Sequence, residues 1–179
     1  MINKIKFTFK KPGGDRIYYV NKEDVMVVLN RLPEEVYSNT KEIHFNDKGY
    51  GVQYRQCPGY INQIRKEISL CALPPRFSFS RFCGRAISPK VFGAVRGKQW
   101  SKLAIRRFML YDVLLHEIGH QQIIKANAKT LRRKYAGETK AQEFADLWRM
   151  NLWAKHFDHP DPVHNPPKKE EFLVYENDE

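Results

Sequence analysis

Residues 114–122 read LLHEIGHQQ and end a longer stretch, residues 101–122, in which apolar side chains recur at helical spacing. The apolar positions are Leu103, Ala104, Phe108, Val113, Leu114, Leu115 and Ile118. They cover a broad surface of a helix, and Ser101 is a candidate N-cap for it. We therefore predict a helix from Ser101 onwards that carries the sequence HEIGH into the core.

The two histidines of HEIGH have the spacing of a metal site. His116 and His120 are four positions apart, which on a helix is a rotation of about 40°, so both imidazoles can reach one ion. Imidazole nitrogen suits zinc, and a catalytic zinc site takes three protein ligands and leaves a fourth position to water. Glu117 follows the first histidine, which places its carboxylate beside that water as a general base. The sequence therefore predicts a zinc site that activates water.

The pattern HExxH can also arise by chance, in which case the histidines are ordinary residues of a helix. A chance match in a chain of this length is expected about once in a few hundred sequences. The apolar neighbours Leu114, Leu115 and Ile118 make the helix a buried one. A buried His-Glu-His face without a metal ion would carry a large desolvation cost, so this context favours a metal site.

The segment LLHEIGHQQ resembles the active-site helix of the zincin metallopeptidases. The metzincin branch would need Gly and His at positions 123 and 126, where this chain has Ile123 and Ala126. The resemblance is therefore to gluzincins of a compact bacterial type. It implies hydrolysis of peptide bonds by zinc-activated water in an α+β, zincin-like fold. In such a fold a small, twisted sheet, mixed or antiparallel, packs on the active-site helix and on a second, ligand-bearing helix.

In gluzincins the third ligand is a Glu from the second helix, often followed by an Asp that orients a histidine. We predict that helix from about Glu138 to about His156, and its segment AQEFADLW supplies Glu143 and Asp146. The spacing is one residue shorter than the ExxAD of related bacterial peptidases. Glu143 is the expected third ligand, and Glu138, Asp146 or a late histidine are the alternatives.

Further polar residues are candidates for supporting roles. A donor to the developing oxyanion is usual in this chemistry, and Tyr135 and His156 are candidates, although both residue types are more often packed or on the surface. Asp146, three positions after the expected ligand, either orients an imidazole or is a solvated helix charge. His159 and His164 lie in a proline-rich segment and are expected to be solvated.

The residues before the metal helix predict a sheet. Residues 4–10 alternate in polarity, and the turn KPGGD leads to RIYYV, so we predict an N-terminal hairpin within residues 1–20. Asn21 is a candidate cap for a following helix. Further strands are predicted at residues 41–45 and within residues 59–73.

The resemblance covers about residues 22–157 and implies how the substrate binds. In zincins an edge strand before the metal helix pairs with an extended peptide. Residues 59–73 and residues 76–92 are both candidates for that edge. We expect a single domain over residues 1–160, followed by residues 161–179, which are rich in proline and then acidic.

The net charge of +11 is unevenly distributed, because no Asp or Glu occurs from Ile68 to Tyr111. Within that range the basic residues of the stretch 76–107 are interleaved with aromatic ones. Cations bind phosphate and rings stack on bases, so the alternative function is a basic nucleic-acid-binding protein with a structural or vestigial zinc site. The same cations suit an acidic substrate or the chain's own acidic tail. No nucleic-acid-binding module is spelled out, which favours the peptidase.

Two further sequence features bear on the setting. The N-terminal residues contain no apolar run of signal-peptide length, and no stretch approaches the roughly 20 apolar residues of a membrane span. We therefore expect a cytoplasmic protein without a membrane partner. Cys57, Cys71 and Cys83 form no CxxC pair, which predicts reduced thiols. Their surroundings, LCALP and FCGR, also do not match the Gly-Cys-Leu setting of the deformylases, which use HExxH as well.

Overall fold

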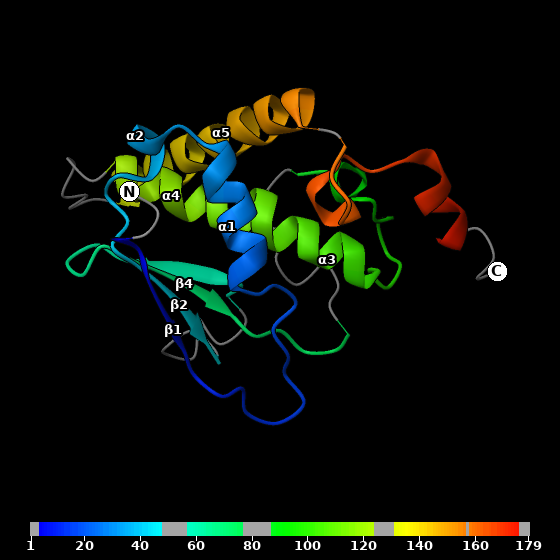
Figure 1. The fold of residues 1–179 in the computed structure, drawn as a ribbon, viewed down its shortest axis with the longest axis horizontal. Helices are drawn as coiled ribbons and strands as arrows, with labels where there is room; N and C mark the ends of the chain where they lie inside the picture. Colours follow the sequence, from blue (N-terminus) through cyan, green and yellow to red (C-terminus); the bar gives the residue numbers. More distant parts are fainter. Residues whose placement is uncertain (1–3, 48–56, 77–86, 124–130, 157, 176–179) are drawn as a thin grey trace.

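The computed structural model describes residues 4–47, 57–76, 87–123, 131–156 and 158–175, with only the backbone for residues 131–136. The fold is α+β, with a sheet below and helices above it in Figure 1. The predicted α+β class and the small mixed sheet are confirmed. The predictions that fall on residues 77–86, on Cys83 and on the side chain of Tyr135 lie outside the described residues.

The sheet has four strands in the order β1-β2-β4-β3. Their bounds are β1 (Lys6–Phe9), β2 (Glu42–Asn46), β3 (Gly59–Asn62) and β4 (Glu67–Cys71). β1, β2 and β4 are parallel to one another, whereas β3 pairs with β4 in the antiparallel sense. β3 therefore forms one edge of the sheet within the described part of the chain.

The predicted N-terminal hairpin of residues 1–20 is wrong. β1 pairs in parallel with β2, with Lys6 opposite Glu42, and residues 16–20 make an isolated bridge between Ile17 and Leu73 instead of a second strand. The pairing with β2 stacks the ring of Phe9 on that of Phe45, with 4.7 Å between centroids. Aromatic stacking across strands stabilises this register, which a local hairpin would not allow.

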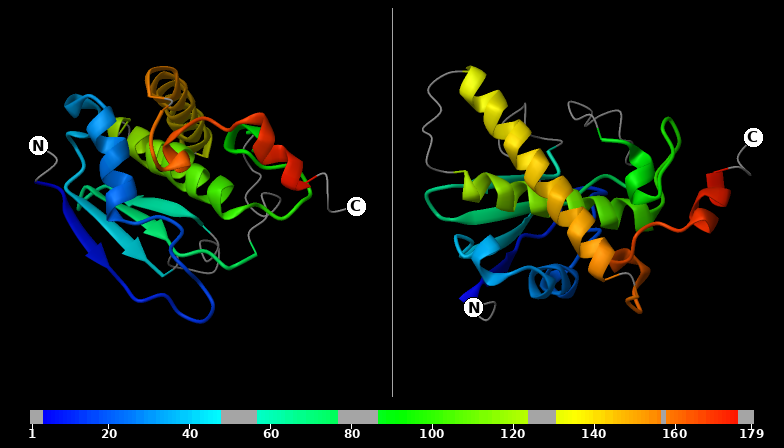
Figure 2. Two further views of the ribbon diagram at one scale, coloured as in Figure 1. Left: turned by 45° about the vertical axis from the view of Figure 1, so that its right-hand side comes forward. Right: turned by 90° about the horizontal axis from the view of Figure 1, so that it is seen from above.

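The described residues form five α-helices, all on one side of the sheet (Figure 1). Their bounds are α1 (Lys22–Arg31), α2 (Glu34–Tyr37), α3 (Lys102–Phe108), α4 (Leu115–Gln122) and α5 (Leu131–Lys155). The shorter elements are the 3-10 helices η4 (Pro89–Phe92), η6 (Pro162–His164) and η7 (Lys169–Tyr175) and the π-helix η5 (Met109–Leu114). Figure 2 shows α4 between the sheet and α5. None of the described helices is long and apolar enough to cross a membrane.

The predicted helix caps are confirmed. Asn21 accepts a hydrogen bond from the backbone N–H of Asp24, whose carboxylate accepts one from the backbone N–H of Asn21 in return. Ser101 Oγ accepts a hydrogen bond from the N–H of Ala104 at 3.1 Å. The helix that begins at α3 continues through η5 into α4, so the sequence HEIGH lies on a buried helix as expected. Ile118 is fully buried in this helix.

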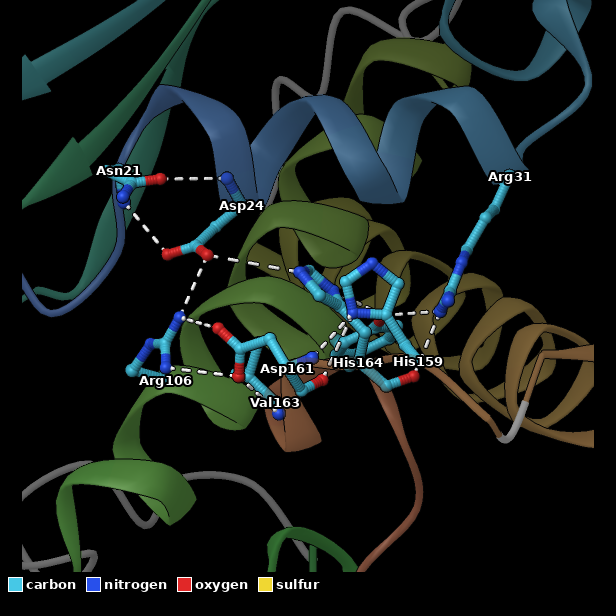
Figure 3. Close-up of polar contacts among 9 residues, drawn as sticks. Asn21, Asp24, Arg31, Arg106, His159, Asp161, Val163 and His164 are labelled. Carbon is cyan, nitrogen blue, oxygen red and sulfur yellow. Dashed lines mark hydrogen bonds and ion pairs between the residues drawn. The ribbon is translucent and has the colours of Figure 1, made fainter.

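Residues 158–175 pack against α3, and Figure 3 shows part of this contact. Arg106 pairs with both Asp161 and Asp24. Arg107, which is 0% exposed, pairs with Glu171 and donates to the backbone oxygens of Asn165 and Pro162. The last two residues of the basic stretch therefore bind the chain's own acidic residues.

The prediction that His164 is solvated is wrong, because its side chain is buried. Its Nδ1 lies 3.0 Å from the hydroxyl oxygen of the buried Tyr111, and Figure 3 shows the ring pointing into the contact between α1 and α3. A backbone oxygen of the same residue accepts from Arg31. Tertiary packing thus orders a segment whose prolines alone suggest an exposed tail.

Candidate metal centre

Three side chains from two helices converge at one point. His116 and His120 project from α4, and Glu138 projects from α5. Nε2 of His116 lies 3.2 Å from Oε2 of Glu138, and Nε2 of His120 lies 3.3 Å from Oε1 of the same carboxylate. One ligand atom from each residue lies within 4.8 Å of the others. The spacing predicted from HEIGH therefore does place both imidazoles on one site.

The distances fit a divalent metal ion. A tetrahedral zinc ion at about 2.0–2.1 Å from its ligands separates the ligand atoms by roughly 3.3 Å. The two nitrogen–oxygen distances, 3.2 Å to Oε2 and 3.3 Å to Oε1 of the same carboxylate, are of that size. His116 is buried, whereas the side chains of His120 and Glu138 are 18% and 58% exposed. A closed inner side and an open outer side suit three protein ligands with a remaining position for water.

The third member of the group is Glu138 and not Glu143, which was the expected ligand. Ala141 and Ala145 are fully buried, and they define the face of α5 that is turned toward the core. Glu138 lies three and seven positions before them, so it shares that face. Glu143 lies two positions after Ala141, about 200° away around the helix, and its side chain is exposed. The helical spacing of Ala141 and Ala145 in the sequence could have indicated that Glu138 lies on the core-facing side of α5 and is the better candidate for the third ligand.

A glycine allows α4 and α5 to approach each other closely. A Cβ on Gly119 would lie 3.1 Å from the backbone oxygen of Ala141 and 3.1 Å from a ring carbon of Phe144. The crossing point is thus one helical turn from His116 on α4 and one turn from Glu138 on α5. Close contact here brings the histidines and the carboxylate within ligand distance of one another.

The carboxyl group of Glu138 stays ionised in this site. Hydrogen bonds from His116 and His120 hold its pKa well below the ordinary value, although partial burial acts in the opposite direction. A metal ligand must be deprotonated to bind. The carboxylate of Glu138 is therefore in the form that binds a metal ion.

Glu117 lies beside the two histidines around α4, on the side that faces β3. A Cβ on Gly59, the first residue of β3, would lie 3.5 Å from Cγ of Glu117. Burial is the main cause that raises the pKa of the Cys71 thiol to about 12, and the nearby charge of Glu117 adds to this effect. The Glu117 side chain, 5% exposed, thus lies between the metal-binding helix and the edge strand.

Two of the expected supporting residues, Asp146 and His156, do not reach the site. Asp146 accepts hydrogen bonds from Gln142 and Arg149, and neither partner is an imidazole. His156 lies eighteen residues after Glu138, and α5 carries it about 27 Å along the helix axis. An oxyanion donor must lie within about 3 Å of the reacting oxygen, so His156 cannot serve as one.

A buried polar network that the sequence did not suggest borders the site. Asp112, which is 0% exposed, lies one turn before His116 in the π-helix η5. Its Oδ1 accepts a hydrogen bond from Nε2 of Gln142 at 2.9 Å and lies 3.5 Å from a guanidinium nitrogen of Arg149. π-Helical segments are frequent at functional sites. In the sequence, an acid at a core-facing position four residues before His116 was the available signal.

The chain was compared with known proteins in three ways. No protein-family model matches it, and neither the search of curated proteins nor the search of solved structures gave a match.

Proposed function

We propose that this chain is a zinc-dependent peptidase of the gluzincin type, with His116, His120 and Glu138 as metal ligands and Glu117 as general base. The observation that carries the proposal is the convergence of both HEIGH histidines on the carboxylate of Glu138, at 3.2 and 3.3 Å. The donor set of two imidazoles and one carboxylate is one that catalytic zinc sites use. Other divalent metals accept the same donors, and zinc is the one that the HExxH pattern favours.

The chemistry divides between the metal and the chain. When bound, zinc lowers the pKa of its water to about 7 and polarises the substrate carbonyl. Glu117 would take a proton from the attacking water as its oxygen bonds to the carbonyl carbon, and would deliver that proton to the amine nitrogen as the C–N bond breaks, which leaves a carboxyl and an amino group. Glu117 is adjacent to a ligand in sequence but points to the sheet side of α4, which is where a substrate would lie.

The edge strand β3 supports a peptide as the substrate. Its first residue, Gly59, borders Glu117, and among the described residues only β4 pairs with it, along one of its two edges. An extended peptide can pair with a free edge through backbone hydrogen bonds and so lie across the site. Of the two candidate edges in the sequence, residues 59–73 thus have support, and most of residues 76–92 lie outside the described part.

The nucleic-acid-binding alternative has less support. Its main basis is the basic stretch 76–107, which contains no Asp or Glu and is interleaved with aromatic residues. Arg106 and Arg107 of the basic stretch are occupied by Asp24, Asp161 and Glu171 and are therefore not available to phosphate. A cytoplasmic location stays a prediction.

The proposal can be tested by removing and restoring the metal. The full chain, purified in zinc-containing medium, should contain one zinc ion per molecule and should cleave members of a mixed peptide library. A chelator should abolish cleavage, and added zinc should restore it. Steeply salt-dependent binding of DNA or RNA by a chain that neither holds zinc nor cuts peptides would support the alternative instead.

A further inference from the structure

Two complementary polar atoms near the candidate metal centre are buried and have no hydrogen-bond partner within the described part of the chain. They are Nδ1 of His116 and Oε1 of Gln142. A ring N–H is a donor and an amide oxygen is an acceptor. Leaving either one buried and unpaired costs about 1–3 kcal/mol, so two such atoms of opposite kind call for an explanation.

His116 and Gln142 take part in two neighbouring contacts between the helix that carries HEIGH and α5. Glu138 contacts His116 at 3.2 Å, and one turn further along α5 Gln142 contacts Asp112 at 2.9 Å. Asp112 in turn lies one turn before His116. His116, Glu138, Gln142 and Asp112 therefore form the four corners of one small group of polar side chains between the two helices.

The amide of Gln142 has only one favourable orientation. Its Nε2 donates to Oδ1 of Asp112 at 2.9 Å and to Oδ1 of Asp146 at 3.0 Å. Ionised carboxylates only accept hydrogen bonds, so a flipped amide would place its oxygen against both of them. Arg149 pairs with the same two acids and holds them in place. Oε1 of Gln142 is thereby fixed as an acceptor that points away from Asp112 and Asp146.

We infer that Gln142 is a positioning residue for the metal ligand His116: the two unpaired atoms are not bonded to each other in the structure, and a turn of the imidazole brings its Nδ1–H to Oε1 of Gln142 when Nε2 binds the metal. This inference rests on the proposed function. A ligating histidine usually donates its second ring N–H to an oxygen acceptor, which fixes the tautomer and the ring orientation. In this chain the acceptor is a neutral amide oxygen, while the neighbouring carboxylates are used to hold the amide.

The direct test is nuclear magnetic resonance of the zinc-loaded wild-type chain labelled with nitrogen-15 in histidine. We expect His116 to bind zinc through Nε2 and to show a protonated Nδ1 whose hydrogen exchanges slowly with water. A metal-bound Nδ1, or an Nδ1–H that exchanges at the rate of a solvated imidazole, would overturn the inference. This measurement needs no variant.

Zinc affinity, measured by competition with a chelator, gives the second test. Gln142→Leu should weaken zinc binding about 10-fold. Gln142→Glu should retain most of the affinity, because a protonated carboxyl group can donate to Asp112 and accept from His116 as the amide does. Glu143→Gln, an exposed change one residue away, is the matched control and should have no effect.

The possible outcomes distinguish a failure of the proposed function from a failure of the inference about Gln142. A wild-type chain that binds no zinc would overturn the proposed function and the inference together. If the wild-type chain binds zinc and the Gln142→Leu variant binds it equally tightly, the inference alone is overturned. A loss of affinity in Gln142→Leu that Gln142→Glu restores would support the inference, because a merely structural defect would not be rescued in this way.

Discussion

Oε2 of Glu138 lies 3.2 Å from Nε2 of His116, although the two residues are 22 positions apart and belong to different helices. The carboxylate also reaches His120 at 3.3 Å. Since the contact depends on how α5 crosses α4, the candidate metal centre is a property of the helix pair and not of HEIGH alone.

We predict that Glu138→Gln lowers zinc affinity by at least about 100-fold, because it removes a charged ligand and not merely a supporting hydrogen bond. Isothermal titration or chelator competition measures this. Glu143→Gln on the same helix is the control. Equal affinities of the two variants would show that Glu138 is not a ligand.

Gly119→Ala should destabilise the fold by about 1–3 kcal/mol, because the added methyl group overpacks the crossing of α4 and α5. It would approach Ala141 O and Phe144 to 3.1 Å. Gly137→Ala is a matched control on α5, where a Cβ meets nothing within 4 Å. There the change should stabilise by about 0.5–1 kcal/mol. Urea unfolding of the two metal-free variants compares them, and similar shifts would contradict the tight crossing.

The contact between the C-terminal segment and α3 can be tested at Glu171. Glu171→Ala leaves the buried guanidinium of Arg107 without its carboxylate partner, and we expect a loss of about 2 kcal/mol in unfolding free energy. Glu170→Ala, at an exposed neighbouring position, should have almost no effect. If thermal unfolding shows no difference between the two variants, the segment is not held in the way described.

His164 should make stability depend on pH. Burial is the main cause that lowers its pKa from 6.5 to about 4, with His159 and Arg31 adding to the effect, while Asp161 opposes it. The unfolded chain therefore binds the proton more readily, and the stabilising contribution of neutral His164 is lost as pH falls from about 6.5 to about 4. In His164→Gln this contribution is absent, so the difference in unfolding free energy between wild type and variant should shrink over that range. A constant difference from pH 7 to pH 4 would contradict the assignment.

Local signals predicted the helices better than the strand pairing. The caps at Asn21 and Ser101 are decided by residues three positions apart, so their chemistry is legible in the sequence. The sequence does not show which strand pairs with β1, because Phe9 and Phe45 meet through a pairing of strands that are distant in the chain. The turn KPGGD suggested a hairpin, and tertiary stacking determined a different partner.

The candidate site divides in the same way. His116, Glu117 and His120 follow from the spacing of one motif on one helix. The choice of Glu138 over Glu143 depends on which face of α5 is buried, and the small residues Gly119 and Ala141 determine that face. The network of Asp112 and Gln142 depends on the same packing, which only the three-dimensional arrangement reveals.

The most direct test of the central claim compares peptide cleavage by the zinc-loaded wild-type chain and by the Glu117→Gln variant at equal zinc occupancy. Glu117 moves the proton but does not hold the metal, so the variant should bind zinc as the wild type does and should lose cleavage by about 100-fold or more. Cleavage that survives in the variant, or a wild-type chain that holds zinc and cuts no peptide, would contradict the account.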